Sequence, residues 1–166
     1  MFQSTKQRRV AQIVFGVYLA LLTWLVLFKF STNLSQLPSV RSINWIPFYY
    51  DLETNTHRLE VFYNIIVFVP LGVYLHIFRE KWKFTSKCLA VCCTSLLFEL
   101  IQFVFAIGAS DVTDLIGNSF GGLIGILFCM ILCKLMPRKF VSLVNGLGAM
   151  IEIGLIGMLT LLLTVN

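Results

Sequence analysis

The groups in this sequence that could do chemistry are polar side chains set in an otherwise apolar stretch, residues 95–125. Within residues 99–102 and within residues 111–118 they stand three or four positions apart, so each set lies on one face of a helix. Ionisable side chains inside a membrane are costly, and they usually face the interior of a helix bundle at a functional site. The carboxylates are the main candidates for binding a ligand or transferring a proton. The predicted site comprises Glu99, Gln102, Asp111, Asp114 and Asn118.

Asp111 also has a purely structural interpretation. An Asp at the N-cap of a helix, with an acidic residue three positions later, forms a capping box that satisfies free backbone N–H groups at the helix start. Asp111 and Asp114 have this spacing. Capping and ligand binding therefore both remain open for Asp111, whereas its predicted neighbours Glu99 and Asn118 favour a binding role for Asp114.

The elements that must position these groups are membrane helices. Of the 166 residues, 58% are hydrophobic and 13% are charged, against about 45–50% and about 25% in ordinary soluble domains. A helix of roughly 20 apolar residues spans a bilayer. We predict an all-α polytopic membrane helix bundle, formed as a single domain over residues 1–166, with five transmembrane helices at residues 10–30, 61–78, 87–107, 111–135 and 140–165.

The positions of the cations predict the orientation of the bundle. Ten of the 13 Lys and Arg residues lie at the N-terminus and in the second and fourth connections. The positive-inside rule then puts the N-terminus in the cytoplasm and, after five spans, the C-terminus outside. The net charge of +5 needs no nucleic-acid partner, because topology accounts for it. The predicted partner is the lipid bilayer.

This orientation places the polar groups in the outer leaflet. Asn64, at the start of the second span, lies at the same level and joins the predicted binding cluster. The preceding polar segment, residues 31–60, is expected to lie on the outer membrane surface, since Trp and Tyr favour the headgroup region. Its predicted contacts with a ligand are made by Trp45, Pro47, Phe48 and Tyr49.

A row of small residues adjoins the polar stripe of the fourth predicted helix. Gly117, Gly121 and Gly125 recur every four residues, and small residues at this spacing let membrane helices approach closely. We interpret them as a helix-packing face directly below the polar cluster. A larger residue at Gly121 is expected to impair folding.

No metal and no cofactor are predicted. The five Cys and two His residues lack the spacing of metal ligands. Carboxylate and amide oxygens would suit Mg²⁺ or Ca²⁺, but the sequence has no phosphate-binding Gly-rich loop, His-Glu-x-x-His or Gly-x-Ser-x-Gly motif. Glu152, in the last predicted span, is interpreted as an acid that pairs inside the bundle or remains protonated.

Four ordered blocks resemble the VanZ-like family over residues 43–136. They are Asn44-Trp-Ile-Pro-Phe48, Asn64-Ile-Ile-Val-Phe-Val-Pro-Leu-Gly72, Ser95-x-x-x-Glu99-x-x-Gln102, and Asp111-x-x-Asp114-x-x-x-Asn118-x-x-Gly121-x-x-x-Gly125. The resemblance implies a bacterial membrane protein associated with resistance to teicoplanin and related lipoglycopeptides, without an established reaction.

One position departs from the family pattern. Many family members have an arginine just before the first Asp of the last block, where this chain has Ser110 preceded by Ala109. A nearby cation stabilises charged carboxylates. The departure implies that Arg41 or Arg58 from the outer segment substitutes for that arginine, or that one of the acids is protonated.

Three classes of function follow from these features. The favoured one is a non-enzymatic envelope protein whose outer-leaflet site binds a lipid-linked cell-wall component or the lipidated drug. The second is an enzyme acting on a lipid or peptidoglycan precursor, with Glu99 or Asp114 as general base. The third is a proton-coupled lipid transporter that uses the paired acids as a relay.

Overall fold

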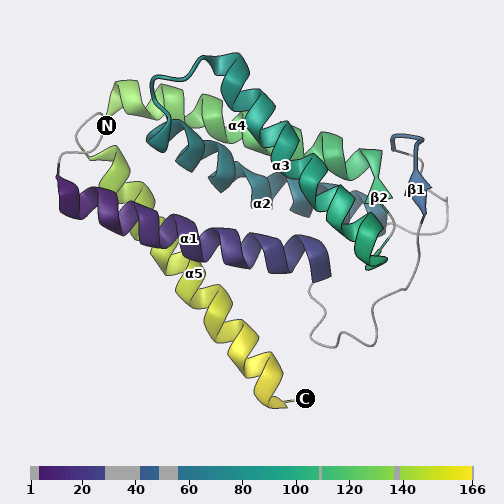
Figure 1. Cartoon of the computed structure of the whole chain (residues 1–166). Coiled ribbons are helices and arrows are strands. Elements are labelled where there is room, and N and C mark those ends of the chain that lie inside the picture. The colour runs from purple at the N-terminus through teal and green to yellow at the C-terminus, as the bar shows by residue number, and fades with distance from the viewer. Residues whose placement is uncertain (1–3, 29–41, 49–55, 109, 137–138, 166) are drawn as a thin grey trace.

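The computed structural model describes residues 4–28, 42–48, 56–108, 110–136 and 139–165, with the backbone alone at 56–58, 162–163 and 165. These residues form five long helices and two very short strands (Figure 1). Each helix is long and apolar enough to cross a membrane. The predicted all-α bundle of five membrane helices is thereby confirmed, and the orientation of its termini stays a prediction. In chain order the elements are α1 (Thr5–Phe28), β1 (Ile43–Asn44), α2 (Thr56–Phe78), α3 (Phe84–Phe105), β2 (Ser110–Asp111), α4 (Val112–Leu135) and α5 (Phe140–Val165).

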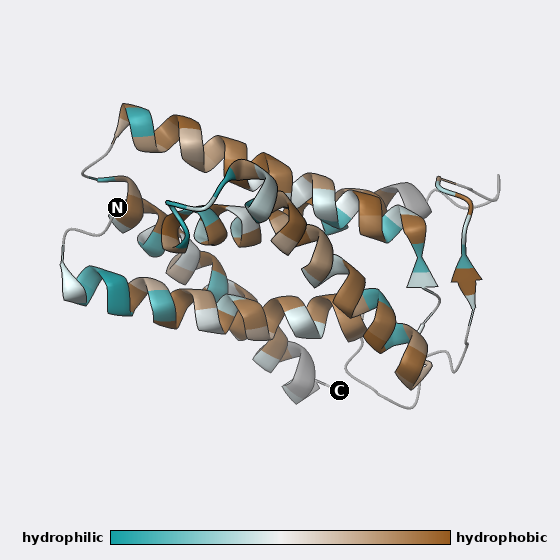
Figure 2. Cartoon of the chain, turned by 45° about the horizontal axis from the view of Figure 1, so that its top comes forward, coloured by the Kyte–Doolittle hydropathy of each residue, from teal (hydrophilic) through white to brown (hydrophobic). Residues whose placement is uncertain are grey.

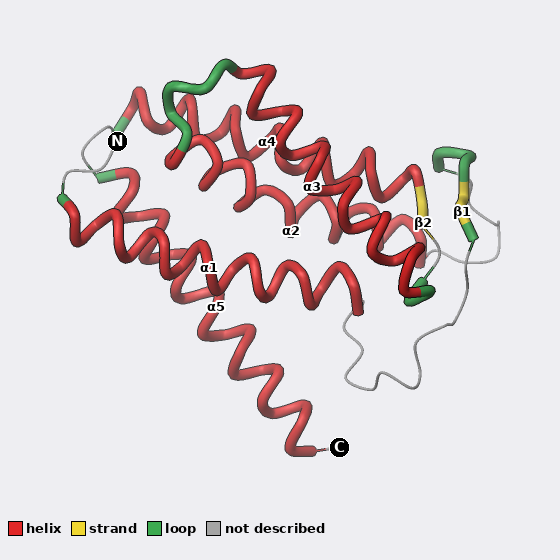
Figure 3. Tube along the Cα trace, in the orientation of Figure 1, coloured by secondary structure: helices red, strands yellow, loops and turns green. Residues whose placement is uncertain are grey.

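The helices α2, α3 and α4 form one group, and α1 and α5 form a second pair beside it (Figures 1 and 3). The most extensive contact in the bundle joins α2 to α4, and α3 packs on α4. Helix α5 runs along α1 at its N-terminal half and then diverges from the bundle (Figure 1). The two strands lie together at the end of the bundle where α3 finishes and α4 starts, and we call this the strand end.

Glycines explain why α2 and α4 approach so closely. A Cβ atom built on Gly121 would overlap the carbonyl oxygen of Ile65, and one on Gly125 would overlap that of Val69. Of the three predicted glycines, Gly117 makes no such close approach. A Cβ at Gly117 would meet Val61 at an ordinary van der Waals distance of 3.7 Å. The backbones of α2 and α4 thus pack directly against each other one turn below the polar groups.

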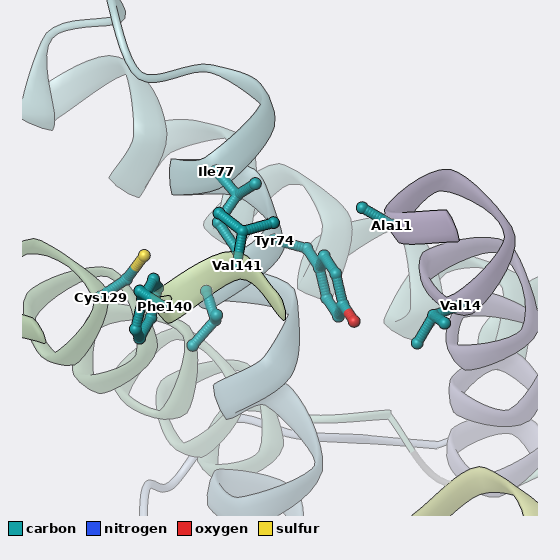
Figure 4. Close-up of a cluster of buried hydrophobic side chains, with 8 residues drawn as sticks. Ala11, Val14, Tyr74, Ile77, Cys129, Phe140 and Val141 are labelled. Carbon is teal, nitrogen blue, oxygen red and sulfur yellow. The ribbon is translucent and has the colours of Figure 1, made fainter. Parts of the chain in front are cut away.

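Two apolar clusters fill the interior. One of them joins α1, α2, α4 and the start of α5, with Tyr74 between Ala11 and Val14 on one side and Phe140 and Cys129 on the other (Figure 4). The outer surfaces of the helices are also largely apolar (Figure 2). In a soluble protein this exposure would favour aggregation, whereas lipid tails contact such surfaces in a membrane.

Several helix boundaries differ from the prediction. Helix α2 begins at Thr56, so the last residues of the predicted surface segment are helical. Helix α3 begins at Phe84 and ends at Phe105, which places Lys87 inside the helix. The buried Lys87 ammonium donates to the Glu80 carbonyl (3.2 Å) and lies 3.2 Å from His76 Nδ1. These contacts stabilise the charged Lys87 side chain inside the helix. Helix α3 therefore begins before Lys87, the start that hydropathy predicts.

Strands β1 and β2 pair in parallel, with Ile43 beside Ser110 and Asn44 beside Asp111. Parallel strands require a crossover connection, usually a helix. Here the crossover consists of two whole membrane helices, α2 and α3. The pairing fixes residues 43–44 against the start of α4.

Candidate functional site

The connection from α3 to α4 delivers the first acidic groups. Helix α3 ends because Ala106 takes a left-handed conformation (φ 54°), and its N–H is bonded to carbonyls of the last turn. The chain then returns through β2 to Asp111, the N-cap of α4. The Asp111 Oδ1 atom accepts from the Thr113 N–H at 2.7 Å. The capping role left open by the sequence is therefore observed.

The capping box itself is not completed by Asp114. The Asp111 N–H donates instead to Glu99 Oε2 of α3 at 3.0 Å, and Ser110 Oγ donates to the Glu99 carbonyl at 2.8 Å. The second Asp111 oxygen, Oδ2, accepts from Asn44 Nδ2 at 3.1 Å. Asp111 thus connects α3, α4 and β1, and its neighbour across the helix connection is Glu99.

Because Asp114 takes no part in the cap, it is available to another helix. Its Oδ1 atom accepts from Asn64 Nδ2 of α2 at 2.7 Å, and the Asp114 side chain is buried. The predicted alignment of Asn64 with the acids is present in the structure. One turn further along α4, Asn118 Nδ2 donates to Ser95 Oγ of α3 at 3.0 Å.

Gln102 has a different position from the other predicted residues. It is buried, and its Nε2 donates to the carbonyl oxygen of Val26 in α1 at 2.9 Å. It lines neither of the two cavities described next. Gln102 therefore joins α3 to α1 rather than facing a ligand space.

Two cavities adjoin these groups at the strand end. The Glu99 cavity, of about 270 Å³, has Glu99 and Asp111 in its wall, and the rest of its lining is almost wholly apolar: Ile43, Trp45, Leu96, Leu100, Phe103, Ser110, Val112 and Leu115. The Asp114 cavity, of about 200 Å³, is smaller and more polar, and it is lined by Leu25, Val26, Glu60, Tyr63, Asn64, Asp114 and Asn118. Apart from Gln102, the predicted cluster is thus distributed over these two cavities.

The predicted surface contacts are only partly positioned at these spaces. Trp45 lines the Glu99 cavity. Phe48 is exposed, and its N–H donates to Thr113 Oγ1 at 3.0 Å, so the turn that contains Pro47 and Phe48 is fixed to the first turn of α4. Tyr49 and Arg41, and the side chain of Arg58, lie outside the described residues.

Sequence reasoning missed three residues that hold the site together. Asn44 bonds Asp111, Ser110 bonds Glu99, and Thr113 receives the N–H of Phe48. Asn44 belongs to the first family-like block, which was the one available signal. Ser110 and Thr113 act through contacts with other elements, and the spacing of residues along the sequence does not predict such contacts. Among the described residues no group of three or more His, Cys, Asp and Glu side chains could hold a metal ion.

Comparisons with known proteins agree with this architecture. A family model described as VanZ/LLP1 matches residues 15–133. A protein of Enterococcus faecium called "Protein VanZ" is 42% identical over 113 residues, which cover 67% of this chain and 68% of that protein. No solved structure matches the chain. Together with its five membrane helices, these matches identify the chain as a multi-pass bacterial membrane protein that belongs to the VanZ/LLP1 family.

Proposed function

We propose that this protein modulates resistance to teicoplanin and other lipoglycopeptides by binding an amphipathic ligand at the strand end, in the outer leaflet. The ligand is either a lipid-linked component of the cell envelope or the lipidated drug itself. The association of the VanZ-like family with teicoplanin resistance is the reason for proposing this phenotype. The Glu99 cavity supplies the physical reason for choosing this part of the molecule.

The observation that carries the proposal is the composition of the Glu99 cavity. Leu96, Leu100 and Phe103 of α3 form one wall, and all three are exposed on the surface of the bundle, where lipid tails contact a membrane protein. Glu99, whose side chain is buried, and Asp111 are the acidic members of the same lining. Ligand sites are mostly apolar with a few placed polar groups. A molecule with an acyl chain and a hydrogen-bonding head group matches both the apolar and the acidic residues of this lining.

Trp45 completes this arrangement from the outer segment. Its side chain is 73% exposed and lines the same cavity. Trp is amphipathic and favours the membrane–water boundary. We infer that Trp45 contacts the ligand at the junction between the acyl chain and the polar head group of the ligand.

The test compares drug susceptibility of a sensitive bacterium that produces the wild-type protein or single variants, with membrane levels checked by immunoblot. Glu99→Gln and Asp114→Asn replace the carboxyl group by an amide but keep an oxygen that can accept the bonds from Asp111 and Asn64. We expect the wild type to protect against teicoplanin and a lipoglycopeptide, but not against vancomycin, which lacks the lipid tail. Both variants should lose this protection.

Two matched controls separate binding from folding. Glu152→Gln makes the same chemical change at a buried acid outside the site and should keep the protection. Leu96→Phe narrows the Glu99 cavity, whereas Leu97→Phe changes an exposed neighbour outside its lining. Of these two leucine variants, Leu96→Phe should lose the protection and Leu97→Phe should keep it. Equal protection by all variants at equal membrane levels would contradict the proposed site.

A further inference from the structure

A third cavity lies at the opposite end of the molecule, between the N-terminal ends of α1 and α5. Its volume is about 700 Å³, within the range of about 300–1,000 Å³ that is usual for small-molecule sites. The lining contains five polar side chains at the first turns of these helices and one from the next turn of α5: Ser4, Lys6, Gln7, Lys139, Ser142 and Asn145. This composition differs sharply from the apolar lining of the Glu99 cavity.

The cavity has a positive electrostatic environment. Within the described residues, neither the Lys6 nor the Lys139 ammonium makes an ion pair or a hydrogen bond. No carboxylate belongs to the lining. The positive ends of the α1 and α5 dipoles face the same space, because both helices begin there. An anion in the cavity would be stabilised by two lysines and two helix ends.

Hydrogen-bond donors lie beside the lysines. Ser4 Oγ accepts from the Gln7 N–H at 3.1 Å, so its hydroxyl hydrogen can be donated to a ligand. Asn145 is 5% exposed and is held by two long contacts, from Tyr74 Oη to its Oδ1 (3.4 Å) and from its Nδ2 to the Gln7 carbonyl (3.5 Å). One N–H of its amide remains for a ligand. These groups suit the oxygen atoms of a phosphate.

The location of the cavity, at the ends of two membrane helices, favours a lipid as the molecule that carries the phosphate. Both helices are long and apolar enough to cross a membrane, and the ends of such a span lie near the lipid head groups. Basic pockets between membrane helices at this level bind anionic head groups. We propose that this cavity binds the phosphate-bearing head group of an anionic phospholipid, which holds the ends of α1 and α5 together. None of the lining residues falls within the stretch matched by the family model, residues 15–133, so this site is independent of the proposed resistance function.

The test is native mass spectrometry of the purified full chain in detergent, with phosphatidylglycerol or zwitterionic phosphatidylcholine added. Phosphatidylglycerol should bind with higher affinity. Each lysine near an anionic surface contributes about fivefold to binding, so the double variant Lys6→Gln/Lys139→Gln should weaken phosphatidylglycerol binding about 25-fold. The matched control, Lys81→Gln/Lys83→Gln, removes two exposed cations that do not line the cavity and should change the affinity less than threefold.

A second pair of variants keeps every charge. A Cβ at Gly146 or at Gly154 meets nothing within 4 Å, but only Gly146 lines the cavity. Gly146→Leu should reduce phosphatidylglycerol binding at least tenfold, and Gly154→Leu should leave it unchanged.

Three outcomes would overturn the proposal. Equal losses in the two lysine pairs would show attraction by overall charge instead of a site. Equal affinity for the two lipids would exclude recognition of the anionic head group. Binding of soluble glycerol phosphate as tightly as the lipid would make the cavity a site for a soluble phosphate ester.

Discussion

The α2–α4 pair and the α1–α5 pair use glycine differently. On α4, Gly121 and Gly125 face carbonyl oxygens of α2, and neither position has room for a Cβ. On α5, a Cβ at Gly148 would meet side-chain atoms of Val14 and Tyr74 at 3.1 Å, whereas one at Gly154 or Gly157, where α5 has diverged, would meet nothing within 4 Å. The difference lies in the partner, because Ile65 and Val69 repeat on α2 at the same four-residue interval as the glycines opposite them. Glycine content alone therefore does not identify a close helix contact.

The two pairs also differ in the polar groups at their ends. The strand end of the α2–α4 pair carries carboxylates and amides, whereas the α1–α5 pair begins with unpaired lysines among the described residues. The predicted orientation puts the first in the outer leaflet and the second at the cytoplasmic surface. In this orientation the two faces of the membrane differ in the charge of the polar groups beside them.

The largest expected effect tests the orientation itself. We expect a cysteine at Ile46, which is exposed in the outer segment, to react with a membrane-impermeant maleimide in intact cells. A cysteine at Lys83, in the turn between α2 and α3, should react only after permeabilisation. Wild-type protein is the background control, since its five cysteines lie within the membrane helices. The reverse pattern would invert the assignment of the two faces.

The next effect compares the two glycine rows. Gly121→Ala forces apart the α2 and α4 backbones, and overpacking costs about 1–3 kcal/mol. Since backbone atoms cannot rotate away, we expect a loss of about 3 kcal/mol in unfolding free energy, measured by denaturation in detergent. Gly154→Ala should change stability by less than about 1 kcal/mol, because it only raises helix propensity. Similar losses in both variants would remove the distinction between the pairs.

The smallest effect concerns the start of α4. Asp111→Ala removes the acceptor for the Thr113 N–H and the partner of Asn44. Loss of an N-cap costs about 1 kcal/mol, and we expect this decrease in the same unfolding assay. Asp111→Asn keeps an oxygen for Thr113 and should cost less than half as much. If Asn and Ala at this position are equally destabilising, the charge of Asp111 matters more than its cap.

The five helices were predictable because each apolar run is long enough to cross a membrane and ends near Gly, Pro or charged residues. The N-cap of Asp111 was also readable from local spacing. The partner of its N–H was not, since Glu99 rather than Asp114 accepts that bond. The pairing of β1 with β2 depends on residues 67 positions apart, and no periodic pattern reports such a contact. Gln102 shares its helix face with Glu99 but bonds α1, which only the placement of α1 could reveal.

The parallel pairing of β1 with β2 has a consequence for biosynthesis. Domains form from the N-terminus onward as a chain is made, and Asn44 leaves the ribosome long before Asp111. The contact between Glu99 and Asp111 needs only the hairpin of α3 and α4, but the bonds from Asn44 and Asn64 to the two aspartates close much longer loops. The order of synthesis therefore makes this arrangement one of the last features to form. A chain stalled before its fourth helix is inserted contains β1 without its partner strand and lacks the Glu99 cavity, which needs residues of both α3 and α4.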